Sequence, residues 1–461
     1  MDFKNYLVPG KTGLLIGIGG VSMSPLAEVL HDAGLDIRGS DMAESSNTLA
    51  LRERGIPIHI GHSADNVTDD ISFVIRTAAV HDDNPEVHEA HRRGIPVFER
   101  TQAWGALMRG YQNALCISGT HGKTTTTSMC THIMMAAEKD PTVMIGGTLP
   151  LLKACHRVGK GNTIIMESCE YYNSFLALNP TIAVVLNIEA DHLDFFKDLE
   201  DIKRSFRRFA ERVPAETGTV IANYDDANTM DALRGIERKV ITFGLNPKAD
   251  VYAQNIVHRG SVSEFDIYHR GNYFARVTLH VPGIHNVRNA LAATAAAIVL
   301  GVSPNAVKYG LAGFEGAGRR FDFKGKFQGA DLYDDYAHHP SELRALLDAV
   351  DTLNYQRTIV VFQPHTYSRT AKLFNDFVEQ LRRPTIVYLA EIYAAREKNT
   401  IGISSADLAA QIPGAKFYPT FAEIERELRR IARPGDIILT VGAGDVFRIG
   451  EQLLQPSDAE S

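Results

Sequence analysis

The segment GTHGKT at residues 119–124 follows an apolar run at residues 114–118 and precedes a long predicted helix. Backbone N–H groups of such a glycine-rich loop bind phosphate oxygens, and the start of the next helix favours negative charge. Lys123 adds a charge for the terminal phosphates, and the Thr124 hydroxyl is a ligand for Mg²⁺. Ile117 stands where a strict GxxxxGK[ST] motif has its first glycine, so the loop is a variant. Because strand, loop, lysine and helix coincide, the segment predicts a phosphate-binding loop in a parallel α/β domain.

The chain around this loop divides into three α/β regions. At about 150 residues per domain, 461 residues predict about three domains. The middle region, residues 109–317, holds the loop, and short alternating segments between residues 250 and 280 predict a small antiparallel sheet. An alanine-rich stretch predicts a helix, and a glycine-dense stretch after it predicts a linker or hinge. These two stretches are residues 289–300 and 310–318.

The two flanking regions also alternate between strand and helix patterns. The first, residues 1–108, begins with a strand, a glycine turn and a helix opened by Ser24-Pro25, where the missing proline N–H costs nothing. The last, residues 318–455, is predicted to be a second domain of this kind, followed by a disordered tail at residues 456–461. The strands expected across the three regions are residues 14–18, 73–75, 96–98, 114–118, 163–166, 182–186, 332–336, 358–362, 386–389 and 437–441.

The composition is that of an ordinary globular protein. Lys and Arg total 48 and Asp and Glu total 55, which gives a net charge of −7. Without a stretch rich in Lys and Arg, we expect no nucleic-acid partner. The four cysteines have no CxxC spacing and predict free thiols in a reducing compartment. No run approaches the roughly 18 apolar residues of a membrane span, so we expect a cytoplasmic protein without membrane contact.

Carboxylates and a histidine follow two further apolar runs of the middle region. Glu167 closes the run at residues 164–166, Glu170 comes three residues later, and His192 follows the run that ends at Asn187. The carboxyl ends of parallel strands meet at one edge of a sheet, where a phosphate loop needs a carboxylate for its metal. We therefore expect these side chains to face one crevice, with either Glu167 or Glu170 as the direct metal ligand. For Glu170, a solvated loop position is an equal alternative.

A second glycine cluster lies near the N-terminus. Gly17, Gly19 and Gly20 resemble the dinucleotide fingerprint, but Ser22 stands where the third glycine belongs. Asp41 lies 22 residues after Gly19, at the end of the second predicted strand, where an acid binds a ribose hydroxyl or captures a backbone N–H. The cluster predicts a second nucleotide-type ligand, and a purely structural turn is the alternative.

In the last region, polar segments follow two predicted strands, as side chains that line a ligand crevice do. They are residues 334–340 and 363–369. Adjacent His338 and His339 point apart if the chain is extended, so we do not predict a structural metal. Arg319-Arg320, after the glycine-dense stretch, is interpreted as a phosphate clamp or as an ordinary solvated basic pair.

Taken in order, eight motifs identify the chain as resembling the Mur ligase family from about residue 14 to residue 449. They are GTHGKTTTT (119–127), ESCEYYNSF (167–175), NIEADHLD (187–194), GIHNVRNALAA (283–293), GAGRRFDFKG (316–325), YDDYAHHPSE (333–342), FQPHTYSRT (362–370) and EIYAAREKNTIGISS (391–405). The resemblance implies an α/β chain of three domains. These are an N-terminal Rossmann-like domain for a UDP-sugar, a central P-loop-type ATPase domain with a small antiparallel sheet, and a C-terminal Rossmann-like domain that closes on ATP.

The reaction implied by the resemblance is ATP-dependent amide formation. The γ-phosphoryl group moves to the lactyl carboxylate of UDP-N-acetylmuramate, and the amine of L-alanine attacks the acyl phosphate. This order is chemically sensible, because phosphorylation gives a free carboxylate the leaving group that it lacks. The implied ligands are ATP, Mg²⁺ and these two small molecules, and the expected state is a monomer or weak homodimer.

The resemblance also implies a role for individual residues. ATP contacts fall on Gly119, Thr120, His121, Gly122, Lys123, Thr124, Thr125, His285, Asn286, Asn289, Arg320 and Asp335. Substrate contacts fall on Gly17, Gly19, Gly20, Ser22, Asp41, His62, Asn84, His121, Glu170 and Tyr336. The metal ligands are Thr124, Glu167 and His192, and the catalytic residues are Lys123, His192, His338, His365 and Arg369.

The sequence departs from the family pattern beside the metal glutamate, where Ser168-Cys169 and Tyr171-Tyr172 replace a more acidic string. Some family members carry a carbamylated lysine, but the spacing of Lys203 from His192 is too short, and we predict no carbamate. Two alternative functions stay open. One is a ligase that attaches a preformed peptide to the same nucleotide sugar during recycling, and the other is a nonhydrolysing nucleotide sensor.

Overall fold

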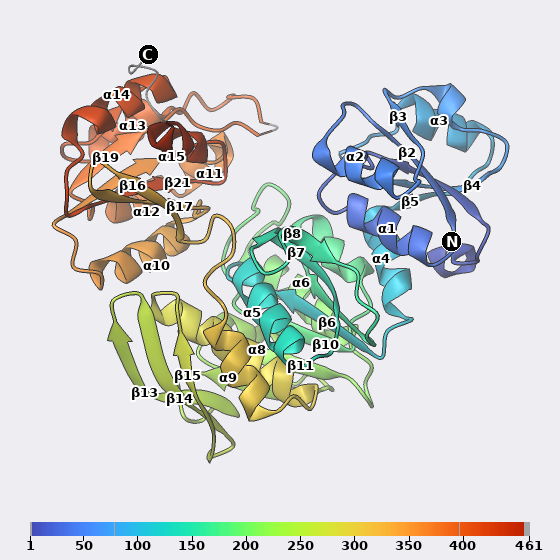
Figure 1. Cartoon of the computed structure of the whole chain (residues 1–461), viewed down its shortest axis with the longest axis horizontal. Helices are drawn as coiled ribbons and strands as arrows, with labels where there is room; N and C mark the ends of the chain where they lie inside the picture. Colours follow the sequence, from blue (N-terminus) through green and yellow to red (C-terminus); the bar gives the residue numbers. More distant parts are fainter. Residues whose placement is uncertain (1, 78, 396, 456–461) are drawn as a thin grey trace. The chain divides into compact units, whose positions relative to one another are not determined.

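The computed structural model describes residues 2–77, 79–395 and 397–455, so the predicted tail at 456–461 lies outside the described residues. The chain is an α/β protein of three domains, and each domain is built on its own sheet (Figure 1). By internal contacts it forms two compact units. The first holds the residues up to Tyr252 together with Tyr268–Asn272 and Leu291–Gly310. The second holds Ala253–Ile267, Tyr273–Ala290 and the chain from Leu311 onwards.

The N-terminal sheet has five parallel strands in the order β3-β2-β1-β4-β5. Its first strand is buried along its whole length, as expected of a central parallel strand covered on both faces. Ser24 and Pro25 begin the following helix, as predicted. The strands are β1 (Thr12–Ile16), β2 (Asp36–Asp41), β3 (Ile58–Ile60), β4 (Ile71–Arg76) and β5 (Val97–Glu99). The helices are α1 (Ser24–Asp32), α2 (Ser46–Glu53), α3 (Pro85–Arg92) and α4 (Arg100–Met108), with short 3-10 turns η1 (Phe3–Tyr6) and η2 (Ala64–Asn66).

The central sheet has ten strands in the order β15-β14-β13-β12-β11-β10-β6-β9-β7-β8. From β12 to β7 neighbouring strands are parallel, and β8 runs antiparallel to β7. Two-residue turns join β13, β14 and β15, which only antiparallel neighbours allow, so the small antiparallel sheet is an extension of this one. The strands are β6 (Asn113–Ser118), β7 (Thr142–Leu149), β8 (Ala154–Arg157), β9 (Thr163–Glu167), β10 (Ile182–Val185), β11 (Thr219–Asn223), β12 (Lys239–Gly244), β13 (Val251–Arg259), β14 (Val262–His269) and β15 (Asn272–Leu279).

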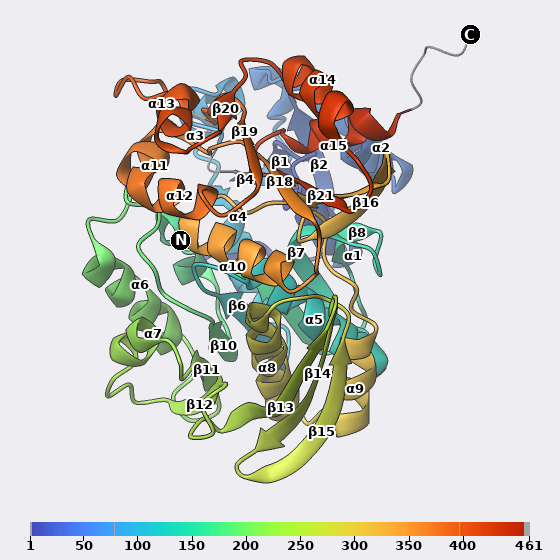
Figure 2. The same ribbon diagram turned by 90° about the vertical axis from the view of Figure 1, so that its left-hand side faces the viewer.

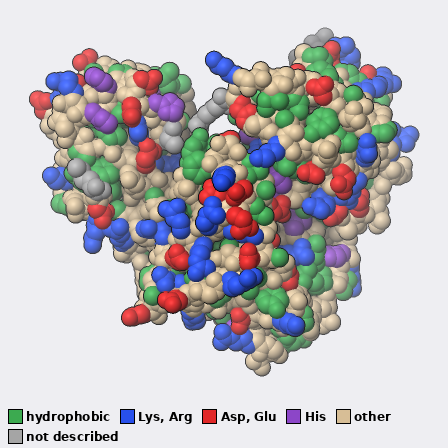
Figure 3. All heavy atoms as spheres, turned by 180° about the vertical axis from the view of Figure 1, so that it is seen from behind, with side chains coloured by type: hydrophobic (Ala, Val, Ile, Leu, Met, Phe, Trp, Pro, Cys, Tyr) green, Lys and Arg blue, Asp and Glu red, His purple; other side chains and the backbone are tan. Residues whose placement is uncertain are grey.

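The helices of this region are α5 (Lys123–Ala136), α6 (Leu199–Glu211), α7 (Ala227–Ala232), α8 (Ile284–Val299) and α9 (Pro304–Ala312), with the 3-10 segment η3 (Tyr171–Ala177). Helix α6 has a strongly polar outer face with charge pairs one turn apart, such as Lys203 with Glu200 and Arg207 with Glu211. Figure 3 shows Lys and Arg side chains interspersed with Asp and Glu side chains near the centre of the drawn face.

The C-terminal sheet has the order β16-β17-β21-β18-β19-β20, with only β16 antiparallel to its neighbour among the described pairs. Two separate hydrophobic cores cover its faces, one under α10, α12 and α13 and one under α14 and α15. Figure 2 shows α14 and α15 on the opposite side of this sheet from α12 and α13. The strands are β16 (Asp322–Phe327), β17 (Ala330–Asp335), β18 (Arg357–Phe362), β19 (Ile386–Leu389), β20 (Lys416–Phe417) and β21 (Asp436–Val441). The helices are α10 (Pro340–Asp351), α11 (Tyr367–Lys372), α12 (Phe374–Leu381), α13 (Ser405–Gln411), α14 (Phe421–Ile431) and α15 (Phe447–Leu454).

Two expectations about the end of the central region are wrong in their bounds. The helix expected at residues 289–300 begins at Ile284, five residues earlier. The glycine-dense stretch 310–318 is not a linker throughout, because α9 continues to Ala312. Gly310 lies inside that helix, and a Cβ atom there would lie 2.5 Å from the Cα atom of Ile133. This glycine therefore allows α9 to pack closely on α5, which the sequence pattern alone mistakes for flexibility.

The cysteines and the helices bear on two further expectations. All four cysteines are free, with Cys116 and Cys130 buried. Among the described residues, no helix is both long and apolar enough to cross a membrane.

We predict that Gly310→Ala lowers the free energy of unfolding by about 1–3 kcal/mol, as overpacking does, although alanine favours helix by about 1 kcal/mol. Chemical denaturation followed by circular dichroism measures this change. Tyr309→Ala, at the neighbouring exposed position, is the matched control and should stay within about 0.5 kcal/mol of the wild type. A Gly310→Ala variant as stable as the wild type would contradict the close packing of the two helices.

Candidate active site

The predicted phosphate loop, residues 119–124, joins β6 to α5 and is fixed by the segment that follows β10. Gly119 has φ +148° and Gly122 has φ +83°, and a Cβ atom on Gly119 would lie 2.8 Å from the Cβ atom of Leu186. Asn187 accepts a hydrogen bond from the backbone N–H of Thr120 at 3.0 Å through its carbonyl oxygen. Its side-chain Oδ1 accepts from the N–H of His121 at 2.8 Å. The loop therefore has a fixed shape that only glycine permits at two positions.

Lys123 is held over this loop by three oxygen atoms. Its Nζ donates to the carbonyl oxygens of Gly119 and Thr120 at 2.5 and 3.0 Å and to Glu170 Oε2 at 3.0 Å. Burial alone would lower the pKa of Lys123, but the nearby negative groups, Glu170 first among them and Glu167 with it, together outweigh burial and raise the pKa above its usual value. Lys123 is therefore a permanent positive charge at the loop.

Thr124 and Glu167 form a second contact at the same sheet edge. Thr124 Oγ1 donates to Glu167 Oε1 at 3.1 Å, and the backbone N–H of Gly146 donates to Glu167 Oε2 at 2.6 Å. Glu167 is the last residue of β9, as predicted. A hydroxyl oxygen beside a carboxylate is the donor set that Mg²⁺ prefers, so these two residues fit the metal. Glu170 instead pairs with Lys123.

His192 lies near Glu170 and comes from the segment after β10. Its Nε2 lies 4.0 Å from Glu170 Oε1, and its backbone has φ +52°. The ring of Tyr171 stacks on it at 4.3 Å between centroids, and the Tyr171 hydroxyl donates to Asp194. Sequence reasoning did not select Tyr171, although its place directly after Glu170 was a usable signal.

The other loop residues predicted to contact ATP are held by Glu189 or lie at the start of α5. His121 Nε2 is 3.4 Å from Glu189 Oε2, and Thr120 Oγ1 accepts from the N–H of Glu189 at 2.9 Å. Thr125 is buried in the first turn of α5. The structure thus brings together Lys123, Thr124, Glu167, Glu170 and His192 in the first unit.

The N-terminal glycine turn is closed by β2. The N–H groups of Gly17 and Ile18 donate to the carbonyl oxygen of Ser40 at 2.8 and 3.0 Å. The N–H of Gly20 donates to the carbonyl oxygen of Gly17 at 3.1 Å. Asp41 Oδ2 accepts from the N–H of Gly19 at 2.8 Å. Of the two expectations for Asp41, this contact corresponds to capture of a backbone N–H.

Three further side chains predicted to bind the substrate have polar partners within the N-terminal domain. Ser22 accepts a hydrogen bond from Arg100, a residue that sequence reasoning missed although it opens α4 directly after a strand. His62 Nδ1 lies 2.8 Å from Glu86 Oε2. Asn84 is the N-cap of α3, and its Oδ1 accepts from the N–H groups of Glu86 and Val87.

His285, Asn286 and Asn289 lie on the first two turns of α8 because that helix begins earlier than predicted. Asn286 donates to the carbonyl oxygen of Pro282 at 2.7 Å, and Asn289 donates to Asn286 Oδ1 at 3.2 Å. Burial, with the nearby Arg288 charge, lowers the pKa of His285 to about 4, so its ring is neutral at pH 7.

In the second unit, Asp335 ends β17 and binds two backbone groups. Its oxygens accept from the N–H groups of Phe321 and Ala337 at 2.7 and 2.8 Å. Burial raises the pKa of Asp335 to about 6, although the Arg320 charge opposes this shift. The guanidinium of Arg320 lies 3.8 Å from Glu342 and 5.1 Å from the centroid of the Tyr336 ring.

Arg319 differs from its neighbour Arg320. It donates to Asp334 at 2.8 Å and to the carbonyl oxygens of Gly442 and Gly444 at 2.6 and 3.0 Å. Neither the phosphate clamp nor the solvated pair describes Arg319, because its guanidinium joins β17 to the loop after β21.

His338, His365 and Arg369 lie together at the carboxyl ends of β17 and β18. The rings of His338 and His365 are 5.7 Å apart, and Arg369 Nη1 is 3.0 Å from His365 Nδ1. His338 Nδ1 lies 3.0 Å from the carbonyl oxygen of Tyr336. The neighbouring His339 is the N-cap of α10.

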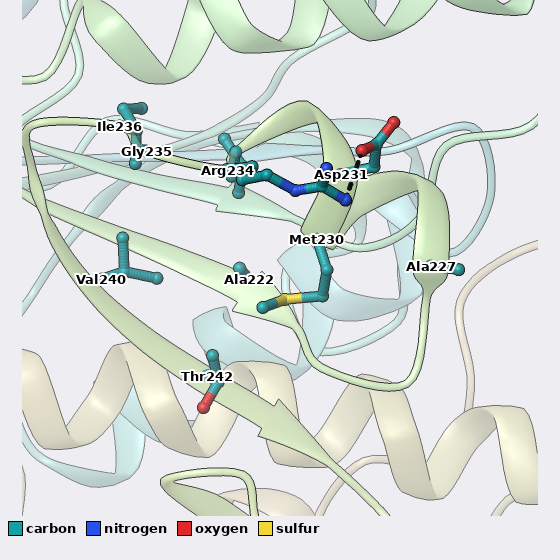
Figure 4. A pocket seen from close by; sticks show the side chains of 10 residues that line it. Ala222, Ala227, Met230, Asp231, Arg234, Gly235, Ile236, Val240 and Thr242 are labelled. Carbon is teal, nitrogen blue, oxygen red and sulfur yellow. Dashed lines mark ion pairs between the residues drawn. The ribbon is translucent and has the colours of Figure 1, made fainter.

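A separate cavity of about 730 Å³ lies in the first unit between α7 and β12 (Figure 4). Its lining is mainly apolar, with Asp231 and Arg234 joined by an ion pair of 2.8 Å. It is lined by Ala222, Ala227, Met230, Asp231, Leu233, Arg234, Gly235, Ile236, Val240 and Thr242. None of the residues predicted from the sequence lines this cavity.

Comparison with protein families matches nearly the whole chain. The Mur ligase family catalytic domain matches residues 15–112, the Mur ligase middle domain residues 117–297, and the Mur ligase glutamate ligase domain residues 319–444. A UDP-N-acetylmuramate–L-alanine ligase of Agathobacter rectalis is 46% identical over 445 residues, which is 95% of this chain and 97% of that protein.

Two solved structures extend this comparison. The UDP-N-acetylmuramate–alanine ligase of Thermotoga maritima has a TM-score of 0.79 and 28% identity, over 96% of this chain and 98% of that one. A murein peptide ligase of Psychrobacter arcticus has a TM-score of 0.69 and 22% identity over the same shares of the two chains, and this shows the common fold.

We predict a pH-dependent stability contribution from Asp335. Its folded pKa of about 6 lies above the ordinary value of 3.8, so the folded protein binds this proton more tightly than the unfolded chain does. The contribution of Asp335 to the free energy of unfolding therefore falls, by roughly 2 kcal/mol, as the pH rises from about 4 to about 6.

Urea denaturation between pH 4 and pH 7 tests this dependence. Asp335→Asn should remove it, whereas Asp351→Asn, an exposed carboxylate paired with Arg383, should keep it. Parallel pH profiles for wild type and Asp335→Asn would contradict the prediction.

Proposed function

Because the chain belongs to the Mur ligase family, we propose that it joins L-alanine to the lactyl carboxylate of UDP-N-acetylmuramate, with cleavage of ATP to ADP and phosphate, in peptidoglycan synthesis. Relatives and a solved structure that carry the name of this ligase support the proposal over almost the full length of both chains. The observation that carries it is the phosphate loop with Lys123, Thr124 and Glu167 assembled at one sheet edge.

The proposed reaction has two chemical steps. A lactyl carboxylate oxygen attacks the γ-phosphorus of ATP, the bond to the bridging oxygen breaks, and ADP leaves. The amine of L-alanine then attacks the acyl phosphate carbon, loses a proton and expels phosphate. The first step needs positive charge at the transferring group, which Lys123 would supply.

Mg²⁺ belongs to this proposal through the oxygen atoms that fit it. Thr124 and Glu167 would hold the ion, with His192 near a second one, and bound Mg²⁺ neutralises charge on phosphate oxygens. Glu170 then has a different task, because it fixes the ammonium of Lys123 at 3.0 Å. This arrangement favours Glu167 over Glu170 as the direct ligand.

The other predicted residues take roles in the same reaction. In the second unit, Arg320 and Asp335 would contact ATP, and Tyr336, His338, His365 and Arg369 would bind the amino acid and the acyl phosphate. The guanidinium of Arg369, placed against His365, is suited to a carboxylate. His285, Asn286 and Asn289 would contact the adenine, and the glycine turn at residues 17–22 with Asp41, His62 and Asn84 would hold the UDP portion. The proposed domain bounds remain 1–108, 109–317 and 318–455, and the proposed location is the cytoplasm.

Two other functions remain as test outcomes. A recycling ligase would use a preformed peptide in place of L-alanine, and a sensor would bind nucleotide without phosphate release. The assembled group of Lys123, Thr124, Glu167 and His192 disfavours the sensor, because binding alone does not require transfer machinery.

Phosphate release with ATP, Mg²⁺ and UDP-N-acetylmuramate tests the proposal directly. We expect release that depends on L-alanine, and mass spectrometry should detect the alanyl product. Lys123→Ala should lose at least about 10²-fold in rate, because a preorganised charge at the transferring group is removed. Lys203→Ala, which removes a lysine paired with Glu200 and Asp231 on α6, should keep the wild-type rate.

The outcomes separate the three functions. Release only with the tripeptide L-alanyl-γ-D-glutamyl-meso-diaminopimelate would assign the chain to recycling. No release with any acceptor would favour the sensor. Full turnover by Lys123→Ala would overturn the assignment of the loop.

We also predict that Glu167→Gln and Glu170→Gln change different kinetic constants of the reaction. Glu167→Gln should raise the Mg²⁺ concentration needed for half-maximal rate by about 10–100-fold, because the carboxylate that would bind the ion is replaced by a neutral amide. Glu170→Gln should instead lower the KM for ATP with little change in the Mg²⁺ requirement, because phosphate no longer has to displace a carboxylate from Lys123. Mg²⁺ titrations at saturating ATP measure the difference, and the reverse pattern would make Glu170 the ligand.

A further inference from the structure

Glu86 is a fully buried carboxylate in the N-terminal domain, with no exposed side-chain area. Its Oε2 accepts from Ser40 Oγ at 2.7 Å and lies 2.8 Å from His62 Nδ1. Its Oε1 accepts from Asn66 Nδ2 at 2.6 Å. Side chains from β2, η2 and the loop between β3 and η2 therefore meet on one carboxylate.

The start of α3 places this carboxylate. Asn84 Oδ1 accepts from the N–H groups of Glu86 and Val87 at 2.9 and 3.3 Å, and Pro85 opens the helix. An acid in the first turn also benefits from the helix dipole. Burying a carboxylate is costly even so, and an apolar side chain in its place is often as stable. Its presence is therefore better explained by what it positions than by stability.

The Glu86 network touches the glycine turn through one residue. Ser40 binds Glu86 with its hydroxyl, while its carbonyl oxygen accepts from the N–H groups of Gly17 and Ile18. The next residue, Asp41, accepts from Gly19. His62 Nδ1 also lies 3.2 Å from Ser40 Oγ, so the His62 ring is fixed beside the proposed nucleotide turn.

We propose that Glu86 is a positioning residue for the nucleotide substrate: it holds His62 with Nδ1–H toward the Glu86 carboxylate, so that Nε2 faces the uridine. The inference rests on the proposed function, which assigns the UDP portion to this domain. A carboxylate on one imidazole nitrogen fixes the tautomer and the ring orientation, as it does for histidines that bind metals. In the neutral ring Nε2 is then an acceptor, which suits an N–H or O–H donor of the uridine.

The test compares two glutamates of α3. Glu86→Gln turns one acceptor into a donor, so Ser40, His62 and Asn66 cannot all be satisfied. The KM for UDP-N-acetylmuramate should rise about tenfold or more, with kcat and the KM values for ATP and L-alanine within about twofold of wild type. Glu89→Gln, one turn further along and paired with Arg92 and Arg93, should leave all of these constants unchanged.

A double-mutant cycle separates positioning from general stability. If Glu86 acts through His62, Glu86→Gln should change the KM by less than about twofold when His62→Asn is already present. Full additivity of the two effects would overturn the inference, because it would show that Glu86 acts independently of the histidine.

A binding measurement that does not depend on catalysis keeps this inference distinct from the proposed function. Calorimetry with UDP should show weaker binding to Glu86→Gln than to Glu89→Gln. If this holds while L-alanine-dependent phosphate release is absent, the ligase proposal fails and the positioning role stands. Equal UDP binding by the two variants overturns the positioning role, whatever the activity.

The tautomer itself is measurable in the wild type, even if Glu86→Gln does not fold. Long-range ¹H–¹⁵N spectra of histidine-labelled protein, with the His62 signal identified by its loss in His62→Asn, should show a protonated Nδ1. A His62 ring with an unprotonated Nδ1 would overturn the inference.

Discussion

The parallel pairing of β6 with β9 and β10 is the constraint on which the central site depends. Its register sets Ile117 beside Glu167 and Ser118 beside Val185, so three chain segments leave the sheet at the same edge. The loop after β6 carries Lys123, the end of β9 carries the carboxylates, and the segment after β10 carries His192. A slip of one residue in the β6–β9 pair would turn the side chain of Glu167, the last residue of β9, to the other face of the sheet.

Local contacts then convert this placement into a defined geometry. Asn187 fixes the loop backbone, and Gly146 fixes the carboxylate of Glu167. The N-terminal domain uses the same logic with other residues, since Asp41 and Ser40 hold the glycine turn from a neighbouring strand. In both cases a strand end supplies the acceptors for a glycine-rich turn that follows the adjacent strand.

Much of this arrangement follows from the sequence, because it depends on order along the chain. Apolar runs followed by polar residues predict strand ends, and Glu167 and Asp41 lie where these patterns place them. The bounds of α8 and the character of Gly310 could not be predicted, because they depend on packing between segments distant in sequence. The difference between Arg319 and Arg320 is of the same kind. The local sequence is symmetric, and only the loop after β21 decides that Arg319 is bound by carbonyl oxygens.

The pairing of Lys123 with Glu170 means that the phosphate loop already contains an anion of its own. In the proposed reaction, a phosphate oxygen that binds this ammonium would displace a carboxylate, so nucleotide binding would exchange one negative partner for another. Weak anions at cellular concentration compete poorly in such an exchange, because they must match a fixed carboxylate in a buried site. Under the proposed function, selectivity for a polyphosphate would therefore begin with this internal competitor.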